Sequence, residues 1–115
     1  MEWTVEFYKD NKGKEPAQNF ILSLDAASRA KVTRYIKLLA TYGVLLKEPY
    51  TKQIKGKMRE IIIIGKDGQL RVLYFTCTGK RFILLHAFIK KTKKTPVSDI
   101  EIAERRMNDY LRRCV

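Results

Sequence analysis

Basic side chains stand at the ends of two apolar segments in the second half of the chain. Arg71 opens one segment, and Lys90 and Lys91 close the segment that begins at Leu84. An antiparallel pair of strands can bring such ends together, so we expect these three cations to lie close to one another. Together they would neutralise a phosphate and stabilise the charge of a phosphodiester during cleavage without a metal. The spacing therefore predicts a nucleic-acid-binding or phosphodiester-cleaving site.

Several basic residues of this half could also have a purely structural role. Arg71 could lie at an exposed strand end or form a salt bridge to Glu60 across a hairpin. Arg59 opens an otherwise apolar strand, which favours a functional role. If the preceding segment is extended, Lys55 and Lys57 share one face with Arg59 and could follow the phosphates of a nucleic acid. The alternative for that row is a charged edge that discourages aggregation.

Other side chains could assist such a site. His86 is the only histidine, and alternation places it on the face of Leu84, Phe88 and Lys90. It is a candidate general base, although a hydrogen-bonded core histidine is the commoner case. Phe88 and Tyr74 could stack on a base or belong to the core. Lys93 and Lys94 could bind RNA or simply lie in a solvated loop before Pro96.

Several classes of enzyme lack their usual residues here. The carboxylates of the second half form no paired set of the kind that a two-metal nuclease needs. The chain also has no phosphate-binding glycine loop and no serine or cysteine nucleophile pattern. RNA carries its own nucleophile, the 2′-hydroxyl, so cations that align it with the phosphorus would suffice. We therefore expect RNA chemistry without a metal or another cofactor.

The hydrophobic pattern predicts one α+β domain spanning residues 1–115. A strand around Trp3–Phe7 precedes two helices, one beginning at Pro16 and one ending at Gly43. Strands at 58–64, 69–77 and 81–89 follow, joined by glycine-containing turns at 65–68 and 78–80. A capping box, Ser98–Glu101, begins a last helix that runs to about Arg113. The order β-α-α-β-β-β-α predicts an antiparallel-rich α+β sheet with helices packed on one face. The two N-terminal helices are expected on that face, and the C-terminal helix completes the domain.

The composition of the chain limits the classes of molecule that it is expected to bind. The 115 residues carry a net charge of +12, of which +2 falls in residues 1–50 and +10 in residues 51–115. Such a bias favours an anionic partner, nucleic acid before an acidic protein or a membrane surface. The longest apolar run, Ile61–Ile64, is too short to span a bilayer. Cys77 and Cys114 form no zinc or disulfide pattern, so a reducing, cytoplasmic setting is expected.

The chain resembles the HigB-type branch of the RelE/ParE toxin superfamily. The resemblance rests on Met58–Ile61, Leu70–Phe75, Ile100–Arg106 and, most specifically, Leu84–Pro96. It implies a fold similar to that of microbial ribonucleases and the toxin of a type II toxin–antitoxin pair. Such toxins cleave mRNA, usually on the ribosome, and are silenced by a helix-turn-helix antitoxin in a toxin–antitoxin hetero-oligomer.

The resemblance also assigns residues. The family's strand-opening arginine falls on Arg71, the basic residue that ends the last strand on Lys90 or Lys91, and the basic residue of its Leu-Arg-Glu-Leu-type motif on Arg59. The motif departs from the family pattern at Met58 and at Ile62, where a second arginine is common. The family's catalytic residues vary, so the resemblance assigns no base.

The hypothesis is a metal-independent, ribosome-dependent endoribonuclease toxin. Arg71 and Lys91 would stabilise the charged phosphate, with Lys90 and Arg59 assisting. The more neutral N-terminal helices would offer a docking surface for the antitoxin, which charge reversal at Arg29, Lys31 and Arg34 would test. A ParE-like toxin that poisons DNA gyrase and a non-catalytic RNA-binding module are the alternatives, and a membrane-bound role is more distant.

Overall fold

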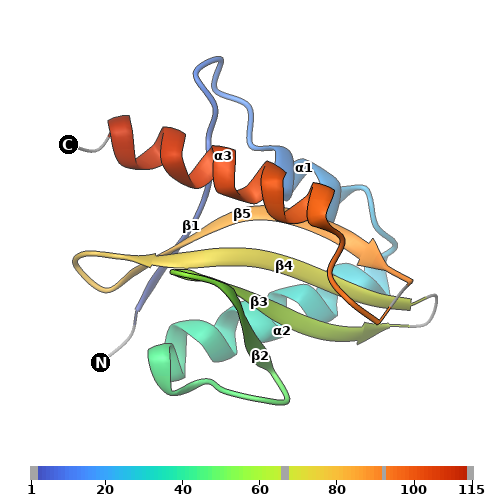
Figure 1. Ribbon diagram of the computed structural model, residues 1–115. Coiled ribbons are helices and arrows are strands. Elements are labelled where there is room, and N and C mark those ends of the chain that lie inside the picture. Colours follow the sequence, from blue (N-terminus) through green and yellow to red (C-terminus); the bar gives the residue numbers. More distant parts are fainter. Residues whose placement is uncertain (1–2, 66–67, 92, 114–115) are drawn as a thin grey trace.

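A computed structural model describes residues 3–65, 68–91 and 93–113, and shows five strands with three α-helices and one short 3-10 helix among them (Figure 1). In chain order the elements are β1 (Thr4–Phe7), α1 (Pro16–Leu22), α2 (Ala26–Tyr42), the 3-10 helix η1 (Gly43–Leu45), β2 (Thr51–Lys55), β3 (Met58–Gly65), β4 (Gly68–Cys77), β5 (Arg81–Lys90) and α3 (Val97–Arg113). The predicted α+β fold class is confirmed.

The five strands form one mixed sheet in the order β1-β5-β4-β3-β2. Strands β2 to β5 pair as consecutive antiparallel neighbours, and β1 joins β5 in parallel. The central strand β4 is rich in β-branched and aromatic residues, which suit a strand flanked on both sides. Gly65 pairs with Gly68 at the β3–β4 hairpin, and the two residues between them lie outside the described residues.

Helices α1 and α2 cover one face of the sheet. Pro16 lies in the first turn of α1, where its missing N–H costs nothing. Val32 and Leu39 of α2 are buried against sheet residues such as Ile61 and Leu84. Gly43 ends α2 with φ 58°, and a Cβ at this position would lie 2.0 Å from Nε1 of Trp3. The end of α2 therefore depends on a glycine that both turns the chain and admits the indole.

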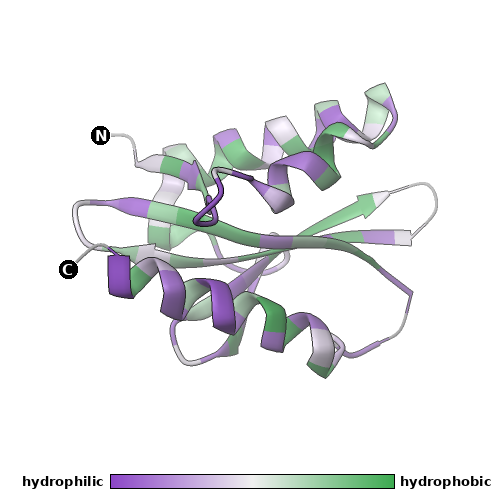
Figure 2. Ribbon diagram, turned by 90° about the horizontal axis from the view of Figure 1, so that it is seen from above, coloured by the Kyte–Doolittle hydropathy of each residue, from purple (hydrophilic) through white to green (hydrophobic). Residues whose placement is uncertain are grey.

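Helix α3 lies on the opposite face, so the expectation that the helices pack on one face is wrong for this helix (Figure 2). Ala103 of α3 is fully buried against a second set of sheet residues, which includes Leu73, Phe75 and Leu85. Alternation along β4 separates these residues from Val72 and Tyr74, which face α1 and α2. Because α3 and the N-terminal helices enclose the sheet between them, most residues of β4 and β5 are buried whichever way they point.

Strand β2 was not among the expected elements. It pairs antiparallel with β3, and the chain turns between them at Gly56 and Lys57. The expected row of Lys55, Lys57 and Arg59 on one face of an extended segment is therefore wrong, because the turn separates Lys55 from Arg59. Within the described residues, no helix is long and apolar enough to cross a membrane.

Candidate functional site

A buried ion pair joins the two central antiparallel strands. Arg71 of β4 donates from Nη1 to Glu60 Oε1 of β3, and from Nη2 to the side-chain oxygen of Gln69. The Arg71 residue is 6% exposed and Glu60 is 1% exposed. Thr95, in the connection between β5 and α3, donates to the other Glu60 oxygen at 2.9 Å. The salt bridge to Glu60 that the sequence left open as an alternative is therefore present.

The hydrogen bonds to Glu60 and Gln69 do not involve the Nε–H of Arg71. Nε of Arg71 is buried and has no hydrogen-bond partner within the part of the chain that the structure describes. A buried N–H without an acceptor costs free energy, and most such groups in native proteins have a partner. This donor lies in a residue that lines an open hollow of about 640 Å³, which we call the basic hollow: Gly68, Gln69, Arg71, Lys90, Lys91 and Lys93.

A bulge in β5 brings Lys90 to this site. Leu73 pairs with His86 and Tyr74 with Leu84, so Leu85 is the extra residue. A bulge shifts the alternation by one residue beyond it. Leu84 therefore faces α1 and α2, whereas His86, Phe88 and Lys90 lie on the face of α3. The expectation that Leu84 shares a face with those three residues is wrong, and Lys90 shares the face of Arg71 because of the bulge.

The hollow is basic in its wall and at its rim. Lys90 is 7% exposed, and burial followed by the charge of Arg71 lowers the pKa of its ammonium group. Among the described residues, the two buried basic side chains, Arg71 and Lys90, have one buried carboxylate beside them, that of Glu60. Lys91 and Lys93 add exposed charges at the rim. The wall therefore has one more basic group than it has carboxylates among the described residues, which suits the negative charge of a phosphodiester.

His86 connects the sheet to α3 and does not line the basic hollow. Its Nε2 lies 2.7 Å from Asp99 Oδ1, and Arg106 Nη1 lies 3.3 Å from its Nδ1. Because arginine can only donate, Nδ1 accepts and Nε2–H donates to Asp99. Burial lowers the pKa of His86 below its ordinary value, while Asp99 opposes the shift. Both ring nitrogens are engaged, an arrangement that favours the alternative of a hydrogen-bonded structural histidine.

Arg59 and Tyr74 lie on the other face of the sheet. They are paired across β3 and β4, and Tyr74 is buried in the core beneath α1 and α2. Arg59 donates from Nη2 to Thr51 Oγ1 at 2.9 Å, which connects it to the start of β2. The structure therefore does not bring Arg59 together with Arg71 and Lys90. The burial of Tyr74 favours its core alternative over stacking on a base.

The remaining candidate residues are distributed around the α3 side of the molecule. Lys55 forms an ion pair with Glu104 of α3 at 3.1 Å, and Lys57 is exposed in the β2–β3 turn. Phe88 is buried and stacks on His86 with ring centroids 5.3 Å apart. Lys94 is exposed in the β5–α3 connection but does not line the basic hollow. Of the predicted set, the hollow thus gathers Arg71, Lys90, Lys91 and Lys93.

Two residues of the site were missed as functional residues by sequence reasoning. Glu60 was considered only as a structural partner of Arg71, and Gln69 was not considered. The sequence does contain a signal for both. Gln69 and Arg71 are two positions apart on one face of a strand, and Glu60 is a lone carboxylate in the neighbouring apolar strand. A buried carboxylate in such a strand needs a cation or donor beside it.

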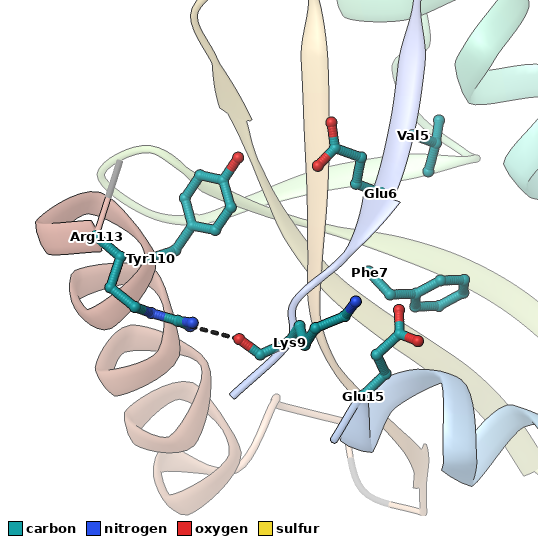
Figure 3. A pocket seen from close by; sticks show the side chains of 7 residues that line it. All are labelled: Val5, Glu6, Phe7, Lys9, Glu15, Tyr110 and Arg113. Carbon is teal, nitrogen blue, oxygen red and sulfur yellow. Dashed lines mark hydrogen bonds between the residues drawn. The ribbon is translucent and has the colours of Figure 1, made fainter. Parts of the chain in front are cut away.

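Another hollow, of about 450 Å³, lies beside the edge strand β1 and the last turns of α3 (Figure 3). It is lined by Val5, Glu6, Phe7, Lys9, Glu15, Tyr110 and Arg113. Arg113 of α3 donates to the backbone oxygen of Lys9 across it. Its charges are balanced, two acidic against two basic, so it lacks the character of an anion site. The described residues contain no cluster of three His, Cys, Asp or Glu side chains suited to a metal.

The fold and the basic hollow define a small α+β protein with a group of basic side chains at the start of β4, at the end of β5 and in the connection to α3. Residues 19–108 match the family described as phage-derived protein Gp49-like (DUF891), and the chain belongs to this family. The family is compatible with a RelE-like toxin of a toxin–antitoxin system. A search of curated proteins finds no significant match to the chain.

Proposed function

We propose that this protein is the toxin of a toxin–antitoxin pair and acts as an endoribonuclease on mRNA, with the basic hollow as its active site. The membership in a toxin-like family supports the first half of the proposal. The observation that carries the second half is the buried Nε–H of Arg71, which has no acceptor among the described residues and belongs to a residue that lines the hollow beside Lys90. A phosphate oxygen would supply that acceptor.

In the proposed reaction the 2′-hydroxyl of RNA attacks the adjacent phosphorus. The bond from phosphorus to the 5′-oxygen breaks, and that oxygen takes up a proton from water. One fragment then carries a 2′,3′-cyclic phosphate and the other a 5′-hydroxyl. Arg71 and Lys90 would stabilise the additional charge on the phosphoryl oxygens, with Lys91 at the rim. DNA lacks the 2′-hydroxyl, so the reaction is specific for RNA.

The proton of the 2′-hydroxyl needs an acceptor. Burial and the neighbouring Arg71 lower the pKa of Lys90, which moves this ammonium toward the neutral form that can accept a proton. Glu60 is engaged by Arg71 and Thr95, and His86 by Asp99 and Arg106. Lys90 is therefore our first candidate for the base, with positioning of the reacting atoms alone as the alternative.

The partners follow from the charge and from the family. The net charge of +12 and the exposed Lys57 and Lys93 suit contact with ribosomal RNA, in support of cleavage on the ribosome. A helix-turn-helix antitoxin of the HigA type would silence the protein. Its docking surface is proposed on α1 and α2, which lie on the opposite face of the sheet from the basic hollow.

The test is expression in bacteria with mapping of the 5′ ends of cellular mRNA. Because Arg71 is buried against Glu60, Arg71→Ala would also remove the partner of a buried carboxylate. Two better variants are Arg71→Lys, which keeps the charge, and the double variant Glu60→Gln with Arg71→Gln, which removes both charges together. Circular dichroism and thermal melting would establish that each variant is folded.

The proposal expects growth arrest and new 5′-hydroxyl ends inside reading frames for the native chain, and loss of both in the folded variants. Full toxicity of the double variant would exclude the basic hollow as the active site. Growth arrest with intact mRNA would instead favour the gyrase-poisoning alternative, which altered plasmid topology would reveal. RNA binding without arrest or cleavage would leave a non-catalytic RNA-binding module.

A further inference from the structure

The guanidinium of Arg71 donates to two side chains, Glu60 and Gln69. These two acceptors differ in how firmly the rest of the protein fixes them. Glu60 is 1% exposed and receives a second hydrogen bond from Thr95 at 2.9 Å, so it is fixed on two sides. It also carries a full negative charge in a buried position, where moving away from Arg71 would be costly. Glu60 is therefore the permanent partner of Arg71.

Gln69 is held more loosely. Its side chain is half-buried and lines the basic hollow, and Arg71 Nη2 is its hydrogen-bond partner among the described residues. The amide oxygen of Gln69 is neutral, so its hydrogen bond to the guanidinium is weaker than the bond that a charged oxygen would form. Gln69 also pairs with Lys90 across β4 and β5, which places it between the two cations of the wall.

The geometry points to Gln69 as a displaceable placeholder in the free protein. We propose that its amide oxygen occupies the place of one phosphodiester oxygen on Arg71 and that the side chain moves aside when RNA binds. Glu60 then remains as the anchor that keeps the guanidinium oriented. The inference rests on the proposed function, since it assigns a role in binding the RNA backbone at the same site.

The physical reason for a placeholder lies in the burial of Arg71. A buried guanidinium with several unsatisfied N–H groups would be costly in the free protein. A second carboxylate would satisfy them but would compete with the substrate. A neutral amide satisfies one donor and is still displaced by a phosphate oxygen, because the anionic oxygen adds the attraction between opposite charges to the hydrogen bond. The unpartnered Nε–H of Arg71 would gain its acceptor at the same step.

The experiment measures binding of a short single-stranded RNA made of 2′-O-methyl nucleotides, which lacks the attacking hydroxyl and is not cleaved. The variants are Gln69→Ala, which removes the placeholder, and Gln69→Glu, which makes it a charged competitor. Gln18→Glu in α1, on the other face of the sheet, is the matched control because it changes the net charge by the same amount. Arg71→Lys tests the site itself, and melting curves confirm that all variants fold.

The expected result is that Gln69→Ala binds this RNA at least as tightly as the native chain. Gln69→Glu should bind it roughly ten-fold more weakly than Gln18→Glu, because the new carboxylate occupies Arg71 permanently. As a direct readout, the side-chain amide resonance of Gln69 should shift when the RNA is added to the native protein.

Two outcomes would overturn the inference while leaving the site in place. One is a loss of affinity in Gln69→Ala as large as that in Arg71→Lys, which would make Gln69 a direct RNA ligand. The other is equal binding by Gln69→Glu and Gln18→Glu. Native binding that Arg71→Lys does not weaken would overturn the proposed site, and the placeholder with it. The Arg71→Lys result therefore separates failure of the placeholder from failure of the proposed function.

Discussion

At the scale of single residues, the ion pair between Arg71 and Glu60 serves two purposes at once. It neutralises a buried cation, and it leaves the Nε–H of that cation without an acceptor among the described residues, in a residue that lines the basic hollow. A paired arginine is usually taken as a structural residue, and an unpaired buried donor points to a ligand. The two observations agree here because a guanidinium has five N–H groups and its carboxylate partner uses only part of them.

The pair predicts that removing one member costs more than removing both. Glu60→Met should destabilise the protein by about 3–5 kcal/mol, because it leaves Arg71 buried without its counter-charge. Adding Arg71→Met should restore most of this loss, since two apolar side chains can fill the same space. Urea unfolding followed by circular dichroism measures both values. Equal stability of the single and double variants would show that Arg71 moves out to solvent when Glu60 is absent.

At the scale of elements, the turn that ends α2 is a place where one residue decides the packing. Gly43 has φ 58°, and its missing Cβ makes room for the ring of Trp3. Gly56, in the β2–β3 turn, has φ 54° and nothing within 4 Å of a Cβ. The two glycines have nearly the same φ but different surroundings. Their comparison separates backbone strain from packing.

Gly43→Ala should therefore destabilise the protein much more than Gly56→Ala. Both variants carry the strain of a positive φ, on the order of 1 kcal/mol. Only Gly43→Ala also drives a methyl group into the indole, which forces Trp3 and its stacked partner Phe82 to shift. Thermal melting of the two variants gives the comparison. A similar fall in Tm for both would mean that Trp3 moves aside without cost.

The contribution of His86, which connects α3 to the sheet, to the stability of the protein should depend on pH. The ring lies between Asp99 and Arg106, and burial lowers its pKa below the ordinary value of 6.5. Since the unfolded chain then binds the proton more readily than the folded one, protonation favours unfolding. The contribution is complete above pH 6.5 and declines as the pH falls below that value toward the lowered pKa.

The native chain should thus lose stability as the pH falls from 6.5 to about 5, and His86→Gln should lose less over that range. Glutamine keeps an amide donor for Asp99 but has no proton to gain. The measurement is the midpoint of urea unfolding at several pH values for both proteins. An identical dependence in the two would show that another group controls it.

The elements were largely predictable from the sequence, and their relative placement was not. Alternation and glycine turns located β3, β4 and β5, and helical spacing located α1 and α2, because these patterns record which side of an element is buried. Strand β2 was missed because Thr51–Lys55 is mostly polar and has no clear alternation. Helix α3 was located, but its face was not, because both faces of the enclosed sheet are apolar.

The same limits apply to the candidate site. The approach of Arg71, Lys90 and Lys91 was predictable because strand ends in a hairpin meet. Arg59 is separated from them in two ways. Alternation places it on the other face of β3, and it pairs with Tyr74, whereas the residue that pairs with Arg71 is Ile62, three positions further along the strand. The place of Lys90 depends on the bulge at Leu85, for which the residues of β5 give no signal.

At the scale of the whole molecule, the basic charge is spread over both faces, while the basic hollow lies on one. Helix α2 contains Arg29, Lys31, Arg34 and Lys37 and no acidic residue, so the far face is also basic. Net charge alone would attract RNA to either face. What distinguishes the two is the hollow with its buried cations, which only the α3 face has among the described residues.

This difference predicts that cations at the hollow and on the far face contribute unequally to the salt dependence of RNA binding. Each phosphate contact in a single strand contributes roughly 0.7 to the slope of log K against log salt. Lys91→Ala and Lys93→Ala should each lower the slope by about that amount, whatever the RNA sequence. Arg34→Ala and Lys37→Ala remove the same charge from the exposed face of α2 and should leave the slope nearly unchanged.

Titrations of the uncleavable RNA at several salt concentrations measure these slopes. Equal effects at all four positions would mean that the overall charge of the molecule binds RNA. The basic hollow would then not be the binding site.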